Sequence, residues 1–279
     1  MKVLLTGSSG QLAKEFIKRF SAEGIGHHAP AENIFDITDK DKVRCVFAEY
    51  KPDLLINCAA YNLVDDAEDN LFKAFAINRD AVEMLALECK AAGVFMIHFG
   101  TDYVFDGRKN DLYAETDAPN PLNTYGKSKF EGEQKAKLAG RSLVLRLSWV
   151  IGDGSQNFLY KLNGWAQKSR VLKISADEVS VPTFTFDIVD ACMKAIDCGL
   201  EGTYHLTNSG YASRYELAKT YCAVKGLDNV IIPVPMSSFK SKAERPLFTA
   251  MSNKLISSKL KIEIPHWQNS LERYCKMTK

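Results

Sequence analysis

A tyrosine and a lysine four residues apart are the side chains in this sequence best suited to acid–base chemistry. Tyr125 and Lys129 stand in the run Thr124-Tyr125-Gly126-Lys127-Ser128-Lys129, and a spacing of four places both on one face of a helix. A phenol ordinarily titrates near pH 10, and moving that value towards neutrality takes about 4 kcal/mol of preference for the phenolate. A fixed ammonium group can supply this preference, so the pair is a candidate proton donor. Such pairs also occur by chance on surface helices, so the interpretation depends on the residues upstream.

The first 20 residues predict a strand, a glycine-containing loop and a helix. An apolar run, Val3-Leu4-Leu5, is followed by Gly7 and Gly10 and by a helix-like stretch through Phe20. The N-terminus of a helix favours phosphate because its N–H groups are unpaired and its dipole is positive there. The spacing Gly-x-x-Gly-x-x-Ala, which ends at Ala13, is looser than the usual dinucleotide fingerprint, and a plain strand-to-helix turn is the alternative. The position directly after the first strand favours a dinucleotide site.

The end of the second strand should distinguish NADH from NADPH. This strand is expected near Ile25 to Ala29, where His27 and His28 stand in place of a ribose-binding carboxylate, and Glu32 and Asp36 come later. A histidine tolerates a 2′-phosphate, so NADPH and NADH both remain open. Solvated turn residues are the alternative interpretation of the two histidines.

The composition indicates a soluble protein that acts on a small molecule. With 279 residues and 46% hydrophobic content, the chain can bury a large core. A net charge of +2 without an arginine-rich block argues against nucleic acid or a membrane surface as partner. The seven cysteines include no Cys-x-x-Cys pair, which suggests free thiols in a reducing cytoplasm. The five histidines show no metal-ligand spacing, and the first apolar run is too short for a signal peptide or membrane span.

Apolar runs and helix-like stretches alternate along the first 150 residues. The apolar runs are Val3-Leu5, Leu54-Asn57, Val94-Phe99 and Leu143-Leu147, and the helix-like stretches are Gln11-Ala22, Lys40-Tyr50, Ala74-Ala92 and Thr124-Leu138. This alternation predicts an α/β protein with a Rossmann-like, doubly wound parallel sheet. Loops that follow parallel strands meet at one edge of the sheet. We therefore expect one cleft formed by Gly7 and Gly10, the run Asn57 to Ala60, and the run Gly100 to Asp102.

The pattern changes after Trp149. Two further stretches, Asn157-Lys168 and Asp187-Ile196, look helical, Val171-Ile174 looks like a strand, and short mixed segments follow. We expect a dinucleotide-binding domain over residues 1–150, with a returning segment near 171–200. A smaller, interleaved α+β substrate lobe is expected over 151–170 and 201–279.

The glycine loop, the run Asn57-Cys58-Ala59-Ala60, Thr101 and the Tyr125/Lys129 pair together resemble the extended short-chain dehydrogenase/reductases. Within them the chain is similar, nearly end to end, to the dTDP-4-dehydrorhamnose reductases. The segments that carry this resemblance are Thr6-Gly7 with Gly10-Gln11-Leu12, Asp36-Ile37-Thr38-Asp39, Thr101-Asp102-Tyr103-Val104-Phe105-Asp106-Gly107, Arg146 with Ser148-Trp149-Val150, and Arg245-Pro246. The run from Thr101 to Gly107 is the most specific of them.

The resemblance implies hydride transfer from NADPH or NADH to the 4-keto carbon of a nucleotide-linked deoxysugar, with dTDP-4-dehydrorhamnose as the expected substrate. Tyr125 would protonate the alkoxide, Lys129 would stabilise the phenolate and hold the nicotinamide ribose, and Thr101 would polarise the keto oxygen. The implied substrate-binding residues are Asn62, Val64, Thr101, Asp102, Tyr103 and Trp149. The expected cofactor-binding residues are Gly7, Gly10, Gln11, Leu12, His28, Asp36, Ile37, Ala59, Ala60, Asn78, Tyr125 and Lys129. Turn, cap and core roles remain the alternatives for the polar and aromatic members.

The sequence departs from the family pattern at several positions. The departures are Ala13 for a glycine, Gly100 for a serine, Asp66 for a lysine, Ile151 for a tyrosine, and Asp177-Glu178-Val179-Ser180 for Asp-Gln-x-Gly. Several are expected on the sugar side, which leaves another nucleotide-activated keto-sugar open as the substrate. Some relatives bind magnesium between subunits through glutamates; Glu15 fits one such position, but Phe186 stands at a second, so we predict no metal.

Other functions remain as alternatives. A dehydratase is disfavoured because Tyr103 replaces the acid that such enzymes carry there, whereas an epimerase keeps the tyrosine and lysine and is harder to exclude. A non-catalytic subunit resembling the regulatory subunit of methionine adenosyltransferase is disfavoured by the intact Thr101, Tyr125 and Lys129. The expected partner is the nucleotide-sugar, and a homodimer is left open as the assembly.

Overall fold

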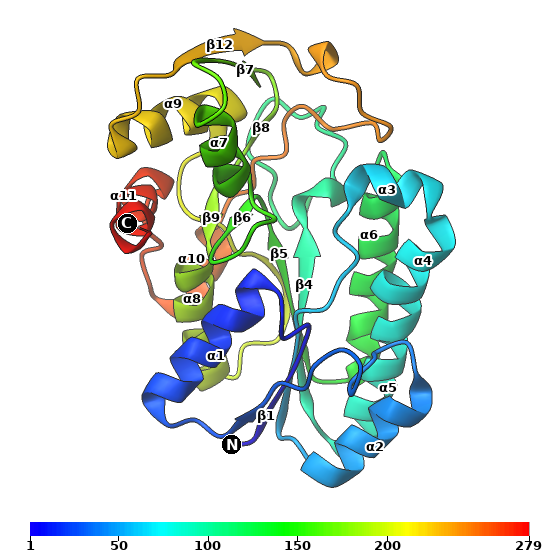
Figure 1. The fold of residues 1–279 in the computed structure, drawn as a ribbon. Coiled ribbons are helices and arrows are strands. Elements are labelled where there is room, and N and C mark those ends of the chain that lie inside the picture. The colour runs from blue at the N-terminus through cyan, green and yellow to red at the C-terminus, as the bar shows by residue number, and fades with distance from the viewer. Residues whose placement is uncertain (279) are drawn as a thin grey trace.

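The computed structural model describes residues 1–278, and a six-stranded parallel sheet forms its centre (Figure 1). The strands, in chain order, are β1 (Val3–Thr6), β2 (His27–His28), β3 (Leu54–Asn57), β4 (Phe95–Thr101), β5 (Ser142–Leu147) and β10 (Gly202–His205). Their order in the sheet is β10-β5-β4-β3-β1-β2. The chain changes direction across the sheet between β1 and β3, and doubly wound sheets bind ligands at such a switch point.

Helices cover both faces of this sheet, as the alternation of elements predicts. One face carries α1 (Gln11–Glu23), α8 (Thr185–Asp197) and α10 (Lys254–Leu260), and the other carries α2 (Lys40–Tyr50), α5 (Ala81–Ala92) and α6 (Thr124–Ala136). Along β1, Val3 and Leu5 pack into the first core and Leu4 into the second. Side chains alternate in this way because successive residues of a strand point to opposite faces. The predicted Rossmann-like fold is confirmed.

The helix predicted over 74–92 is divided in the structure. It consists of the end of α4 (Leu71–Phe75), a π-helical turn at Ala76–Asp80, and α5. Gly132 of α6 packs against this turn so closely that an added Cβ would lie 1.9 Å from the carbonyl oxygen of Asn78. The short helix α3 (Val64–Asp69) precedes α4.

A smaller lobe stands beyond the carboxyl ends of the strands. Its elements are three strand pairs, β6 (Val150–Ile151) with β9 (Thr183–Phe184), β7 (Val171–Ser175) with β12 (Val230–Val234) and β8 (Val179–Ser180) with β11 (Ala212–Ser213), and the helices α7 (Phe158–Ala166), α9 (Arg214–Lys225) and α11 (Trp267–Met277). A separate apolar core holds it together, with Phe184, Leu217 and Trp267 fully or almost fully buried.

Two strands belong to a different lobe from the one expected. The strand β10, expected in the substrate lobe, pairs with β5 in the central sheet, and β7, expected in the returning segment, pairs with β12. Strand β10 joins the central sheet because α8 packs on the sheet and returns the chain beside β5. There β10 pairs with an edge of β5 that would otherwise be unpaired. No helix within residues 1–278 has the length and apolar character needed to cross a membrane.

Candidate active site

A cavity of about 470 Å³ opens where the sheet strands end. Its walls include the loop after β1, the run Cys58 to Ala60 after β3, and Gly100 to Asp102 at the end of β4. The three loops therefore converge as the order of elements predicts. The three residues expected to be catalytic, Thr101, Tyr125 and Lys129, all line this cavity, as do the expected sugar neighbours Asn62, Val64, Asp102, Tyr103 and Trp149.

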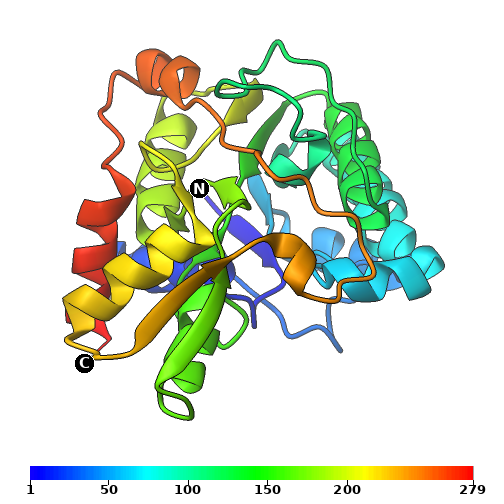
Figure 2. The same cartoon turned by 90° about the horizontal axis from the view of Figure 1, so that it is seen from above.

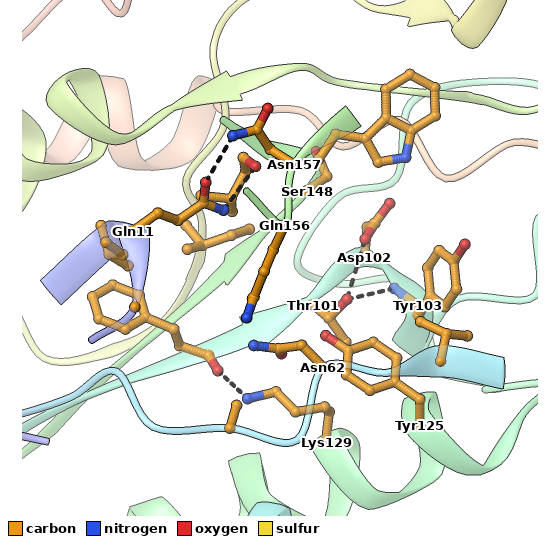
Figure 3. Close-up of a pocket in the computed structure, with 18 of the residues that line it drawn as sticks. Gln11, Asn62, Thr101, Asp102, Tyr103, Tyr125, Lys129, Ser148, Gln156 and Asn157 are labelled. Carbon is orange, nitrogen blue, oxygen red and sulfur yellow. Dashed lines mark hydrogen bonds between the residues drawn. The ribbon is translucent and has the colours of Figure 1, made fainter. Parts of the chain in front are cut away.

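Tyr125 and Thr101 lie together at the base of the cavity. The Tyr125 ring is turned towards the Thr101 side chain (Figure 3). Burial raises the pKa of Tyr125 to about 12, against the opposing effect of a hydrogen bond with Thr101. The phenol therefore keeps its proton at neutral pH, which is the form that a proton donor needs.

The Lys129 ammonium group contacts a backbone carbonyl in this structure and not the Tyr125 phenol. It donates a 2.6 Å hydrogen bond to the carbonyl oxygen of Phe99 and is not among the groups that shift the pKa of Tyr125. Lys129 is 3% exposed, and burial lowers its own pKa to about 8. The two residues share one helix, α6, as predicted, but the tertiary contact with β4 directs the lysine to a backbone acceptor (Figure 3).

Asp102 is held by three hydroxyl groups. Its carboxylate accepts hydrogen bonds from Ser180 at 2.7 Å, Thr249 at 2.6 Å and Thr101 at 3.2 Å. Burial raises the pKa of Asp102, and these hydrogen bonds oppose the shift. Ser180 is one of the departures from the family pattern, and its hydroxyl thus reaches the cavity through Asp102.

Arg245 closes one side of the cavity. Its guanidinium donates to the Tyr103 hydroxyl at 3.1 Å and to the Asp65 carboxylate at 2.6 Å, whereas its buried Nε has no partner. Asp65 also accepts from the backbone N–H groups of Lys242 and Ala243, both at 3.1 Å. The segment that contains Lys242, Ala243 and Arg245 runs from β12 across to α3, so it crosses between the two sides of the molecule (Figure 2).

Trp149 lines the cavity in an unusual backbone conformation. Its φ angle is 37°, a left-handed value that a bulky side chain rarely adopts. The guanidinium carbon of Arg214 lies 3.5 Å from the centre of one of its ring faces, and its buried Nε1 has no partner. Arg214 also lies 3.5 Å from the Glu178 carboxylate. One face of the indole is therefore covered by Arg214, and only the other is open to a ligand in the cavity.

The loop after β1 fits a bound phosphate. Gly7 has a φ of 64°, and a Cβ there would lie 2.8 Å from the backbone of Ala59, so the close approach of the loop after β3 requires this glycine. Helix α1 begins after Gly10 without a side-chain cap, and Gly10 to Ala13 line the cavity. Unpaired N–H groups at a helix N-terminus bind anions. The residues present thus suit the pyrophosphate of a dinucleotide.

The Gln11 side chain makes contacts within the protein. Its Nε2 donates to the Val150 carbonyl at 3.0 Å, and its Oε1 accepts from the Gly152 N–H at 3.1 Å and from Asn157 at 3.3 Å (Figure 3). Gln11 therefore joins the first loop to the β6–α7 loop, whose residues Ser155 to Asn157 also line the cavity. These bonds leave its backbone N–H as the group available to a phosphate.

Five of the expected cofactor residues, Gly7 among them, lie outside the cavity wall. His28 is exposed at the end of β2 and packs against the Tyr50 ring, Asp36 accepts from the Thr38 hydroxyl, and Ile37 is buried in the core. Asn78 is 1% exposed, and its amide bonds the backbone of Tyr61 and the Ser128 hydroxyl. The Asn78 side chain is thus occupied in holding the loop after β3.

Two departures from the family pattern, Asp66 and Ile151, lie outside the cavity wall. Asp66 is exposed on α3 and accepts hydrogen bonds from Tyr61 and Asn70, and Ile151 is 1% exposed in the core of the small lobe. Neither contributes to the cavity wall. The reversed charge at Asp66 therefore does not alter the charge inside the cavity.

Sequence reasoning missed three cationic side chains that line the cavity, which are Arg214, Arg245 and Lys161. Arg245 belongs to the Arg245-Pro246 pair that contributes to the resemblance, which implies no role for it. Arg214 begins α9 directly after a capping box formed by Ser213 and Glu216, and this Ser-x-x-Glu pattern predicts a helix start from sequence. Nothing local in the sequence indicates that these residues line the same cavity as Trp149.

Comparisons with known proteins agree with this geometry. The model of the family described as "RmlD substrate binding domain" matches residues 1–279. The chain is 35% identical over 274 residues to the spore coat polysaccharide biosynthesis protein SpsK of Bacillus subtilis, covering 98% of this chain and 96% of that protein. It is 33% identical to a dTDP-4-dehydrorhamnose reductase of Burkholderia thailandensis, covering 96% of each.

A solved structure is similar over the whole fold. The dTDP-4-dehydrorhamnose reductase of Bacillus anthracis, in complex with NADP, superimposes with a TM-score of 0.96 at 30% identity, covering 99% of both chains. The resemblance seen in the sequence is confirmed: this chain belongs to the RmlD substrate binding domain family, in which the dTDP-4-dehydrorhamnose reductases are found.

Proposed function

We propose that this protein is an NAD(P)H-dependent reductase that converts the 4-keto group of a nucleotide-activated deoxysugar into a hydroxyl group, with dTDP-4-dehydrorhamnose as substrate. The observation that carries the proposal is the placement of Tyr125 and Thr101 in the same cavity as the uncapped N-terminus of α1. One cavity thus joins a proton donor to a phosphate site. The relatives named above as dTDP-4-dehydrorhamnose reductases support the same reaction.

Each of the reacting groups has a defined task. The nicotinamide cofactor, when bound, supplies the hydride to the carbonyl carbon. With substrate bound, Thr101 would turn its one hydroxyl proton from Asp102 to the keto oxygen, and Tyr125 would donate to the same oxygen, on which negative charge develops as the hydride arrives. Tyr125 then gives its proton to this oxygen, and the phenolate that remains lies on the same helix as the Lys129 ammonium.

The remaining residues divide between cofactor and sugar. The backbone of Gly7, Gly10, Gln11 and Leu12 holds the pyrophosphate, Ala59 and Ala60 border the cofactor, and His28, Asp36 and Ile37 stand at its adenosine end. Asn62, Val64, Asp102, Tyr103 and the free face of Trp149 border the sugar. Arg214, Arg245 and Lys161 place positive charge in the cavity, which suits the diphosphate of a nucleotide-sugar. The seven cysteines are free thiols, which suits the reducing cytoplasm in which we place this reaction.

The test is to mix the protein with NADPH or NADH and a panel of nucleotide-linked 4-keto-6-deoxysugars and to follow the absorbance of the reduced cofactor. Consumption with dTDP-4-dehydrorhamnose and a reduced sugar product would support the proposal. Purification with tightly bound NAD⁺ and interconversion of two sugar epimers would favour an epimerase. Absence of turnover with every sugar, together with tight binding to another enzyme, would favour a regulatory subunit.

A further inference from the structure

A buried ion pair lies one helical turn beyond Lys129, behind the wall of the cavity. The Glu133 carboxylate accepts from Arg146 in a fork, with Nε at 3.2 Å from Oε1 and at 3.1 Å from Oε2, and with Nη2 at 3.0 Å from Oε2. Glu133 is 0% exposed and Arg146 is 5% exposed. A buried ion pair is weak evidence for stability, because desolvation offsets much of the attraction. Its position beside Lys129 points to a different role.

Gly100 makes room for this pair. A Cβ at Gly100 would lie 2.1 Å from Oε1 of Glu133 and 3.2 Å from the Arg146 side chain. Gly100 stands between Phe99, whose carbonyl accepts from Lys129, and Thr101. Glu133 therefore packs directly on the stretch of β4 that supports both of these residues. The glycine is also a departure from the serine expected in the family, so this close contact is a property of this chain.

Charged and titratable groups face Lys129 from each element around it. Tyr125 and Glu133 belong to its own helix, Cys58 follows β3, His98 lies on β4, and Arg146 lies on β5 beyond Glu133. Burial holds the thiol of Cys58 protonated by raising its pKa, and burial holds His98 neutral by lowering its pKa. Burial likewise lowers the pKa of Lys129, and Glu133 acts against that shift. Glu133 thus supplies the negative charge that a buried ammonium group needs.

We propose that Glu133, locked by Arg146 and seated on Gly100, is a positioning residue that keeps Lys129 charged and directed at the end of β4. The inference rests on the proposed function, because the ammonium group matters there as the neighbour of the Tyr125 phenolate. Glu133 touches neither the cavity nor the reacting atoms, so it acts through Lys129.

The test measures Lys129 directly. In protein labelled with ¹³C at the lysine Cε, the titration of Lys129 is followed by NMR and assigned with Lys129→Met. We expect a midpoint near 8 in the wild type, as its pKa indicates, and a midpoint lower by about one unit or more in Glu133→Gln, since one carboxylate is lost. Glu131→Gln is the matched control, because Glu131 lies on the same helix but pairs with Arg79 at the surface. An unchanged midpoint in folded Glu133→Gln would overturn the proposal.

A second variant covers the case in which Glu133→Gln does not fold. Glu133→Gln combined with Arg146→Gln removes both buried charges, and its Lys129 should also titrate below the wild-type value. Glu133→Asp should restore the wild-type titration midpoint of Lys129. If Glu133→Asp lowered this midpoint as much as Glu133→Gln does, the shape of the side chain rather than its charge would matter, and the proposal would be overturned. The titration needs no sugar substrate, so a failed reductase assay and an unchanged Lys129 midpoint are separate results.

In the enzyme assay, the alkaline limb of the kcat profile should move to lower pH in Glu133→Gln, with the affinity for NADPH nearly unchanged. A uniform fall in kcat at all pH values, with no shift of the limb, would contradict a role through the charge of Lys129.

Discussion

The guanidinium of Arg245 lies 2.6 Å from the carboxylate of Asp65 and 3.1 Å from the hydroxyl of Tyr103, so a residue late in the chain joins α3 to the wall of the cavity. Its Nε is buried and unpaired, and Arg245 lines the cavity. A partly buried cation with an unused buried donor is suited to an anionic ligand.

Arg245→Met should therefore raise the KM for the nucleotide-sugar while leaving the affinity for NADPH unchanged. Loss of one charge-assisted hydrogen bond of about 2 kcal/mol corresponds to about 30-fold in affinity. Lys242→Met is the control, because Lys242 pairs with Asp69 on an exposed surface, where ion pairs contribute little. Equal KM values in the two variants would exclude a substrate contact.

Tyr125→Phe should reduce kcat by a factor on the order of a hundred or more, because the proton donor is removed while the ring and its packing remain. Cofactor binding, measured by NADPH fluorescence titration, should hardly change. Tyr160→Phe, at an exposed tyrosine of α7, provides the comparison and should retain full turnover. Comparable turnover in both variants would rule out the role of Tyr125.

Gly132→Ala should destabilise the fold. Its methyl group would meet the Asn78 backbone at 1.9 Å, and overpacking of this kind costs about 1–3 kcal/mol. Gly164→Ala in α7 has open space around the new methyl group and should be stabilising by up to about 1 kcal/mol, because alanine favours a helix. Urea unfolding of both variants measures whether the two changes in the free energy of unfolding have opposite signs. A Gly132→Ala protein as stable as Gly164→Ala would show that the π-helical turn shifts freely.

The free energy of unfolding should fall as the pH drops below about 6.5, partly because of His205. Burial lowers the pKa of His205 to about 3, so the unfolded chain binds a proton over a range in which the folded protein does not. Stability therefore decreases with falling pH through this window, by up to about 1.4 kcal/mol per unit for one such histidine. His205→Gln should lessen the slope of unfolding free energy against pH. An identical slope would mean that His205 titrates alike in both states.

The sequence by itself determined five of the six sheet strands and the main catalytic candidates. Apolar runs separated by amphipathic stretches were enough for the alternation of strands and helices, because burial on both faces imposes that pattern locally. The loops with Gly10, Ala59 and Thr101 could be brought together from topology alone, since parallel strands end at one edge. Tyr125 and Lys129 could be placed on one helix face by their spacing.

Tertiary structure decided which hydrogen-bond partners those side chains find. Lys129 bonds the Phe99 carbonyl and Asn78 bonds the Tyr61 backbone because buried polar groups must find partners on adjacent elements. Arg245 reaches Asp65 across 180 residues of sequence. The placement of β10 beside β5 likewise depends on how α8 packs against the sheet. Local patterns contain no information about such contacts, since they arise only when the two sides of the molecule close around the cavity.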